Sequence, residues 1–254
     1  YDVTIIGAGI LGLATGHALL KKNPDIKIII LEKEPNIGQH QTGHNSGVIH
    51  SGIYYKPGSL KAINCRYGIS LLLDFCNYYN IAYDICGKVI LAQNKKELDQ
   101  LHFLKSRGEK NGIKGLKILS RDQILEYEPH AAGFSALYCP ETGIINYGEV
   151  CKKLSKNIEK KGEIITSSFV TSVDARGDEI TIFTEKVEYK TRFLINCAGL
   201  FSDQISELSG FQRKVRIVPF RGEYYTLNNH ARHLVRNLIY PVPDYRYPFL
   251  GVHF

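Results

Sequence analysis

With 254 residues, of which 44% are hydrophobic, the chain is long enough to bury a sizeable core as one large domain or two interleaved ones. No run approaches the roughly 20 apolar residues of a membrane span, and the first residues resemble a strand and not a signal peptide, so we expect a cytoplasmic protein. The net charge of +7 comes from lysines that form no arm or stripe, and the six cysteines show no zinc spacing, which argues against nucleic acid and against a metal site.

The first 33 residues have the pattern of a complete βαβ dinucleotide fingerprint. An apolar β-branched run leads into Gly-x-Gly-x-x-Gly, a helix is expected over residues 10–22, and a second apolar run ends on an acid. The first glycine permits a tight turn, the second lets the backbone approach a pyrophosphate, and the third allows close helix–strand packing. The acid can accept hydrogen bonds from a ribose 2′-hydroxyl. The expected cofactor contacts here are Gly7, Gly9, Ile10, Gly12, Glu32 and Lys33.

A loop rich in small, polar and imidazole side chains follows over residues 38–55. Three histidines and four glycines directly after the expected ribose-binding strand suggest backbone amides and imidazoles arranged against a ligand. A well hydrogen-bonded loop without a ligand is the alternative. The candidate cofactor contacts of the loop are Thr42, Asn45 and Ser46.

Six ordered motifs carry a resemblance that covers the whole chain. They are residues 40–62, Glu128-Pro129-His130, residues 140–144, residues 219–225, residues 238–244 and residues 248–253. Together they resemble the signature of the FAD-dependent L-2-hydroxyglutarate dehydrogenases and oxidases, a branch of the D-amino-acid-oxidase-like flavoproteins.

The resemblance implies an α/β fold in which a Rossmann-like FAD-binding domain is combined with a mixed β-sheet substrate domain. The expected FAD-binding segments are residues 1–80 and 146–210, and the expected substrate-domain segments are residues 81–145 and 211–254. Members of the family continue beyond the position of Phe254 with flavin-contacting segments. We therefore expect the chain to be truncated at its C-terminus.

The remaining elements follow from periodicity and turn residues. Helices are expected over residues 60–80, 95–110 and 147–161, strands over 88–92 and 163–173, a hairpin over 179–191, and a buried parallel strand over 192–199. By resemblance, the backbone of Val170 pairs with the adenine ring, and Ala198 and Gly199 lie beside the pyrophosphate and ribose.

Arginine and tyrosine interleave with apolar strands beyond residue 210. A guanidinium can grip a carboxylate with two hydrogen bonds and a tyrosine hydroxyl can add another, as a dicarboxylic 2-hydroxy acid requires. Arg221 and Tyr224 are the favoured substrate-binding pair; ordinary strand surface and single-stranded nucleic acid are the alternatives. The interleaved residues are Arg213, Arg216, Arg221, Tyr224, Tyr225, Tyr240, Tyr245, Arg246 and Tyr247.

Two histidines compete for the role of catalytic base. His50 is preferred because it follows an apolar pair that can pack against the isoalloxazine and precedes Ser51-Gly52, where small residues leave room for a substrate. His253 is the competitor, and a structural imidazole is the alternative for either. A base that works near neutral pH should have a pKa near 7, and imidazole begins at about 6.5.

The resemblance implies FAD-dependent oxidation of L-2-hydroxyglutarate to 2-oxoglutarate, with quinone or oxygen as the terminal acceptor and a possible peripheral association with the inner face of a membrane. Within the superfamily, an amino-acid or glycerol-3-phosphate oxidase is the alternative. A non-catalytic dinucleotide-binding fragment is the alternative of a different class.

Overall fold

Residues 1–244, 246 and 251–254 are described in a computed structural model, and Tyr245, Tyr247 and the motif residues 248–250 lie outside them. The chain divides into two compact units, each made of two segments. Unit 1 comprises Tyr1–Asn45 and Asn146–Glu223, and unit 2 comprises Ser46–Ile145 and Tyr224–Phe254. The assignment of one domain to FAD and one to substrate stays a prediction.

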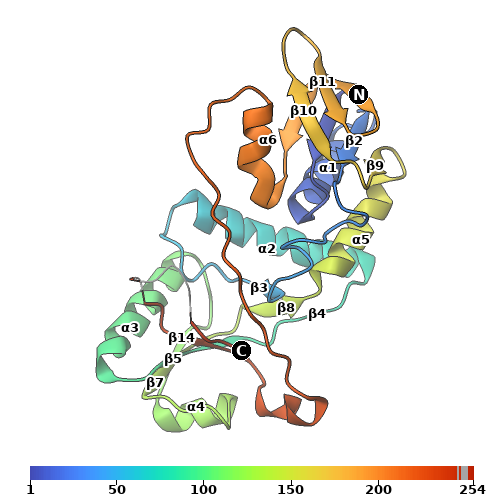
Figure 1. Ribbon diagram of the computed structural model, residues 1–254. Coiled ribbons are helices and arrows are strands. Elements are labelled where there is room, and N and C mark those ends of the chain that lie inside the picture. Colours follow the sequence, from blue (N-terminus) through green and yellow to red (C-terminus); the bar gives the residue numbers. More distant parts are fainter. Residues whose placement is uncertain (245, 247–250) are drawn as a thin grey trace. The chain divides into compact units, whose positions relative to one another are not determined.

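Unit 1 combines a parallel sheet, an antiparallel sheet and helices, and Figure 1 labels several of these elements. Its elements are β1 (Val3–Ile6), α1 (Ile10–Lys22), β2 (Ile28–Leu31), α5 (Tyr147–Ile158), β9 (Glu163–Ile165), β10 (Val170–Asp174), β11 (Ile180–Thr184), β12 (Glu188–Thr191), β13 (Phe193–Asn196), the short 3₁₀ turn η1 (Gly199–Phe201) and α6 (Ser202–Leu208).

The parallel sheet has the strand order β13-β1-β2-β9. Every residue of β1 and β2 is buried, as expected for apolar β-branched runs inside a parallel sheet. The expectation of a buried strand over 192–199 is wrong, because β13 is an edge strand of this sheet and Phe193 is exposed. The carboxyl ends of β13, β1 and β2 lie at one edge, where ligands of open α/β sheets bind.

The antiparallel sheet has the order β10-β11-β12 and includes the hairpin expected over 179–191. The single strand expected over 163–173 is instead two strands, β9 and β10, which belong to different sheets. Between them the chain turns, and Ser167 has a positive φ of 50°. The amide groups of Ser167 and Ser168 donate to the carbonyls of Glu34 and Glu32, which fixes this turn beside the end of β2.

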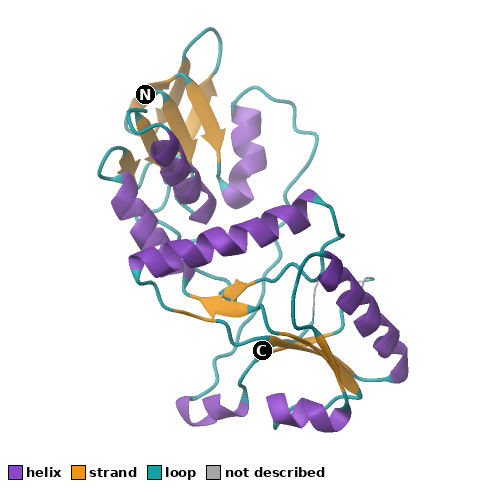
Figure 2. Cartoon of the chain, turned by 180° about the vertical axis from the view of Figure 1, so that it is seen from behind, coloured by secondary structure: helices purple, strands orange, loops and turns teal. Residues whose placement is uncertain are grey.

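Unit 2 contains two small sheets and the long helix α2, and Figure 2 shows its helices and strands from behind. Its elements are β3 (Val48–Ile49), α2 (Leu60–Tyr79), β4 (Tyr83–Asp84), β5 (Lys88–Ala92), α3 (Lys95–Lys110), β6 (Lys117–Leu119), α4 (Arg121–Tyr127), β7 (Ser135–Cys139), β8 (Gly143–Ile145), η2 (Asn229–Leu234) and β14 (Leu238–Pro241). The sheets have the orders β14-β5-β7-β6 and β3-β8-β4. Across the described residues, every helix is too short or too polar to span a membrane.

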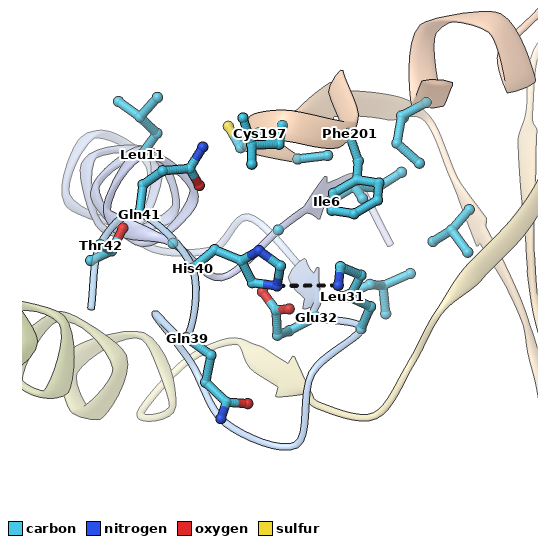
Figure 3. A pocket seen from close by; sticks show the side chains of 18 of the residues that line it. Ile6, Leu11, Leu31, Glu32, Gln39, His40, Gln41, Thr42, Cys197 and Phe201 are labelled. Carbon is cyan, nitrogen blue, oxygen red and sulfur yellow. Dashed lines mark hydrogen bonds between the residues drawn. The ribbon is translucent and has the colours of Figure 1, made fainter. Parts of the chain in front are cut away.

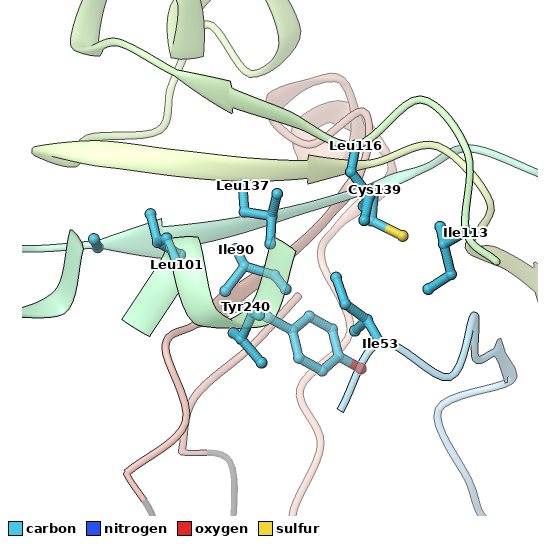
Figure 4. Close-up of a cluster of buried hydrophobic side chains, with 10 residues drawn as sticks. Ile53, Ile90, Leu101, Ile113, Leu116, Leu137, Cys139 and Tyr240 are labelled. Atoms are coloured by element: carbon cyan, nitrogen blue, oxygen red, sulfur yellow. The ribbon is translucent and has the colours of Figure 1, made fainter. Parts of the chain in front are cut away.

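The main core of unit 2 lies on the four-stranded sheet and is drawn in Figure 4. Ile90 of β5 and Leu137 of β7 pack there against Leu101 and Leu104 of α3, and Tyr240 of β14 brings a phenol ring into the same cluster. The result is that β5, the second strand of this sheet, has all five residues buried, including a lysine at its first position.

The structure places the first unit boundary after Asn45 and not after residue 80. The reason is a set of side chains that hold the backbone of residues 51–55 inside unit 2. Asn111 donates to the carbonyls of Gly52 and Tyr55 at 3.1 and 2.9 Å, and Arg107 donates to the carbonyl of Tyr54 at 2.9 Å. These partners come from α3 and the turn after it, about fifty residues away in sequence.

The segment from residue 211 to 228 contains no helix or strand in the described structure. The arginine- and tyrosine-bearing sheet expected there is therefore not formed, because these residues pair with no neighbouring strand. Beyond residue 210, β14 is the strand that the described part of the chain contributes.

Candidate functional site

The three glycines of the fingerprint have different structural roles. Gly7 has a φ of +103°, and a Cβ there would lie 2.5 Å from the carbonyl oxygen of Cys197. A Cβ on Gly12 would lie 1.9 Å from the carbonyl oxygen of Gly7, so close packing of α1 on the turn requires this glycine. A Cβ on Gly9 would meet only the hydroxyl group of Thr42, at 3.3 Å. Gly9 is thus the glycine whose outer side is open for a ligand.

A pocket of about 320 Å³ lies within unit 1, where β1, β2 and β13 end (Figure 3). This volume is within the range of small-molecule sites. The loop of residues 38–42, the turn of 168–170 and helix α6 complete the wall. Nine of the twelve expected cofactor residues line it: Gly7, Gly9, Ile10, Glu32, Lys33, Thr42, Val170, Ala198 and Gly199.

Glu32 has a second role that sequence reasoning missed. Its carboxylate accepts a hydrogen bond from the amide of Ala8 at 2.8 Å and another from the amide of Glu34 at 3.0 Å. The residue is buried, so these bonds tie the glycine turn to the end of β2. Each carboxylate oxygen has two acceptor sites, which leaves capacity for ribose hydroxyl groups.

A charged group lies at the pocket wall beside Glu32. The ammonium group of Lys33 contacts the carboxylate of Glu34, lies 3.1 Å from His40 Nε2, and lies over the ring of Phe201, 4.6 Å from its centroid. The hydrogen bonds from Lys33 and His40 hold the pKa of Glu34 below its usual range. Lys33 is therefore positioned by an anion and an aromatic ring.

The other three expected cofactor residues, Gly12, Asn45 and Ser46, do not line the pocket. Asn45 instead donates to the carbonyl oxygens of Gln41 and Thr42, which shapes the loop. Ser46 belongs to unit 2 and shares a hydrogen bond with Tyr240. The hydroxyl of Thr42 accepts from the amide of Ile10 at 3.0 Å and so holds the loop to the start of α1.

Aromatic residues of the wall were also missed. Phe169 and Phe201 line the pocket, each within two residues of an expected contact, Val170 and Gly199 respectively. Their nearness in sequence to these expected contacts could have predicted them, since a large ring next to a nucleotide contact can provide a stacking surface.

The two candidate bases both lie in unit 2. His50 follows β3; the residue as a whole is exposed to solvent, although protein atoms surround much of its side chain. This burial, the positive charge of Lys88 and the proximity of His253 lower the pKa of His50 to about 4. The expectation of a pKa near 7 is therefore wrong for His50. His253 packs its ring against Tyr240, with the centroids 4.5 Å apart.

The favoured substrate-binding pair lies on the exposed 211–228 segment. Arg221 is 85% exposed and pairs with Glu223 at 3.3 Å. Tyr224 is also exposed, and the pKa of Tyr240 is raised by burial and, to a smaller extent, by the nearby Tyr224. The structure assigns Arg221 to unit 1 and Tyr224 to unit 2. Their joint role in substrate binding stays a prediction.

A parallel sheet with a glycine turn, an acid that closes its second strand and a pocket at the carboxyl ends define a dinucleotide-binding protein of the Rossmann type. The chain belongs to the FAD-dependent oxidoreductase family, whose model matches residues 2–254. The cofactor of this family is FAD. The open side of Gly9, the Glu32 carboxylate and the pocket wall fit the nucleotide part of such a cofactor.

Curated relatives give the comparison more detail. An L-2-hydroxyglutarate dehydrogenase of Indibacter alkaliphilus is 45% identical over 256 residues, which cover 100% of this chain and 64% of the relative. The mitochondrial L-2-hydroxyglutarate dehydrogenases of Bos taurus and Homo sapiens are 45% and 43% identical, again over 100% of this chain and over 58% of their own lengths. The chain thus spans about 60% of the length of the relatives it matches.

Solved structures confirm the D-amino-acid-oxidase-like fold. The FAD-bound L-alpha-glycerophosphate oxidase of Mycoplasma pneumoniae has a TM-score of 0.80 and 24% identity, with 99% of this chain and 69% of that chain covered. The L-proline dehydrogenase of P. horikoshii has a TM-score of 0.78 and 16% identity, with 94% and 64% covered. At these identities the likeness concerns the fold alone.

Proposed function

We propose that the protein oxidises L-2-hydroxyglutarate to 2-oxoglutarate with FAD as the hydride acceptor. The observation that carries the proposal is the 45% identity, over the whole of this chain, to a relative named L-2-hydroxyglutarate dehydrogenase. The pocket of unit 1 supports it independently, because it has the position and the residues of a dinucleotide site. Bound FAD supplies the two-electron oxidant; the chain supplies binding, orientation and a proton acceptor.

In this proposal, unit 1 holds the nucleotide part of FAD. The carboxylate of Glu32 would accept hydrogen bonds from ribose hydroxyl groups, and the backbone at Gly9 and Ile10, at the start of α1, would hold the pyrophosphate. The backbone of Val170 would bind the adenine, and Ala198 and Gly199 would allow close approach of the pyrophosphate and ribose.

Bound FAD would take up the hydride from C2 of the substrate, and a protein base would accept the proton of the substrate hydroxyl group. We propose His50 as this base and His253 as the alternative. With a pKa of about 4, His50 is neutral at pH 7 and has a free acceptor nitrogen. Arg221 and Tyr224 are proposed to contact a carboxylate of the substrate.

The proposed terminal acceptor of the electrons is quinone or oxygen. A quinone acceptor would bring the protein to the inner face of a membrane as a peripheral protein. Measuring how fast a quinone and oxygen each reoxidise the reduced protein distinguishes the two acceptors.

The test of the proposal is anaerobic mixing of the FAD-loaded protein with L-2-hydroxyglutarate. We expect the visible flavin absorption to bleach and 2-oxoglutarate to form in equal amount. D-2-hydroxyglutarate serves as the stereochemical control, and glycerol 3-phosphate and L-amino acids serve as alternative substrates. Bleaching by one of these, with none by L-2-hydroxyglutarate, would assign a different oxidase activity.

A further inference from the structure

The strongest feature outside the nucleotide pocket is a buried lysine in unit 2. Lys88 is the first residue of β5, and the rest of the strand is apolar. The lysine is as deeply buried as its apolar neighbours, at 1% exposure. Its ammonium group lies 3.9 Å from the ring centroid of Tyr240 and 5.4 Å from that of Tyr54. Rings can stabilise a cation through their electron-rich faces, but they do not neutralise its charge.

Two imidazoles lie in the same place. The positive charge of Lys88 acts on His50, His253 also acts on His50, and the His253 ring packs on Tyr240. A side-chain hydrogen bond of the next residue, Ser51, holds His50 near the strand that begins 38 residues later. The hydroxyl of Ser51 accepts from the thiol of Cys139 at 3.3 Å, and Cys139 is the ladder partner of Lys88 between β7 and β5. We call the set His50, Tyr54, Lys88, Tyr240 and His253 the Lys88 cluster.

The Lys88 cluster has no anion of its own among the described residues. The groups that act on the pKa of Lys88 are its burial, which lowers this pKa to about 8, and the thiols of Cys139 and Cys86, which oppose the shift; no carboxylate contributes. Lys88 is therefore mainly a cation at pH 7. A buried cation without a counter-ion costs free energy in the folded state, and such groups are concentrated at functional sites.

We propose that the Lys88 cluster binds a carboxylate of the substrate, with the Lys88 ammonium group as the charge partner and the rings of His50 and His253 beside it. This assignment rests on the proposed oxidation of a 2-hydroxy dicarboxylate. It adds a buried lysine as a second cation for the dicarboxylate, beside the proposed contact at Arg221, which is exposed and paired with Glu223.

The arrangement couples binding to proton transfer. Burial and then the positive charge of Lys88 lower the pKa of His50, and a carboxylate held against Lys88 offsets that positive charge. The His50 ring then becomes a stronger proton acceptor when the substrate is present. Tyr224, which acts on Tyr240, is the exposed residue through which the 211–228 segment reaches the same cluster.

The test uses glutarate, a dicarboxylate that has no hydroxyl group to oxidise, titrated into the FAD-loaded protein by calorimetry. Lys88→Met removes the charge at similar length, and we expect the Kd for glutarate to rise about 10- to 100-fold, as for loss of a charge-assisted hydrogen bond in buried surroundings. The KM for L-2-hydroxyglutarate should rise in parallel. Lys117→Met, at an exposed position of β6, is the matched control and should leave both constants unchanged.

A second measurement does not depend on a variant that folds. In the unsubstituted protein with ¹⁵N-labelled histidine, glutarate should shift the ring nitrogen resonances of His50 and His253 but not those of His102, which is exposed on α3. Unshifted His50 and His253 resonances at saturating glutarate, or an unchanged glutarate Kd in a folded, FAD-loaded Lys88→Met protein, would overturn the proposal.

The two proposals fail separately. If glutarate binding depends on Lys88 but L-2-hydroxyglutarate is not oxidised, the carboxylate site stands and the proposed reaction is wrong. If L-2-hydroxyglutarate is oxidised and Lys88→Met leaves its KM unchanged, the reaction stands and the assignment of Lys88 is wrong.

Discussion

The nucleotide pocket of unit 1 and the Lys88 cluster of unit 2 attract anions by different means. The pocket begins at a glycine turn and the start of α1, where backbone amides supply partial positive charge, and its one buried acid is satisfied by the amides of Ala8 and Glu34. The Lys88 cluster has a full charge on a side chain and no carboxylate partner among the described residues.

The two regions differ in the kind of free-energy cost that each imposes on the folded protein. In the pocket, the cost is steric and falls on positions that must be glycine, so the ligand-free fold is already satisfied. In the cluster, the cost is electrostatic and remains until an anion binds. A substitution at Glu32 should therefore lower stability and cofactor binding together, whereas at Lys88 stability and binding should change in opposite directions.

The largest effect is expected for Gly12→Ala. Because the new Cβ would lie 1.9 Å from the carbonyl oxygen of Gly7, α1 must move away from the turn, and the free energy of unfolding should fall by about 3 kcal/mol or more. Urea denaturation measures this.

Gly9→Ala is the matched control for Gly12→Ala. Its Cβ meets only the hydroxyl of Thr42, so stability should change by less than about 0.5 kcal/mol while FAD binding weakens. Equal stability of the two variants would show that packing at Gly12 is looser than the structure indicates.

His50→Ala tests the proposed role of His50, a member of the Lys88 cluster, as the catalytic base. The variant should keep its FAD and lose about 10²- to 10⁴-fold in kcat, as for removal of a general base. The unsubstituted protein should lose activity as the pH falls toward about 4, where His50 takes up a proton, and the variant should lack this acid limb.

The exposed His102 of α3 provides the comparison, since His102→Ala should leave kcat and the pH profile unchanged. A His50→Ala protein that reduces its flavin at the unsubstituted rate would move the search for the base to His253.

Glu32→Gln should affect both stability and cofactor binding. One oxygen becomes an amino group that cannot accept, so the amide of Ala8 or of Glu34 loses its partner, at a cost of about 1–3 kcal/mol. The affinity for FAD should fall as well, because a ribose acceptor is lost. Unchanged FAD affinity in a destabilised variant would limit Glu32 to its role in the turn.

The smallest effect is expected for Lys88→Met in the ligand-free protein, and it has the opposite sign. Removing a buried cation without a counter-ion should raise the free energy of unfolding by about 1 kcal/mol at pH 7, because the lost cation–π contacts offset part of the gain. Denaturant titrations at two pH values measure it.

The sign of the pH dependence follows from linkage. The pKa of Lys88 is lowered to about 8 in the fold, so the unfolded chain binds more protons between pH 8 and about 10.4, and the unsubstituted protein gains stability over this window. The advantage of Lys88→Met should shrink there. A variant less stable than the unsubstituted protein at pH 7 would indicate that Lys88 is structural.

By itself, the sequence determined the features that depend on neighbours within about 35 residues. The glycine spacing, the helix over 10–22 and the acid at position 32 predicted β1, α1, β2 and the side of the sheet where the pocket lies. The wider motif set predicted the family, which the family model confirms. Such patterns are readable because the geometry of a βαβ unit is local.

Tertiary structure alone decided the Lys88 cluster. Lys88 was predicted only as part of a scaffold strand, and its neighbours His50, Tyr240 and His253 come from positions up to about 200 residues apart. The pKa of His50 could not be predicted either, because it is lowered by burial and by a charge from another strand. The protonation states of His50 and Lys88 depend on burial and on the long-range pairing of strands, and the residue type alone does not predict them.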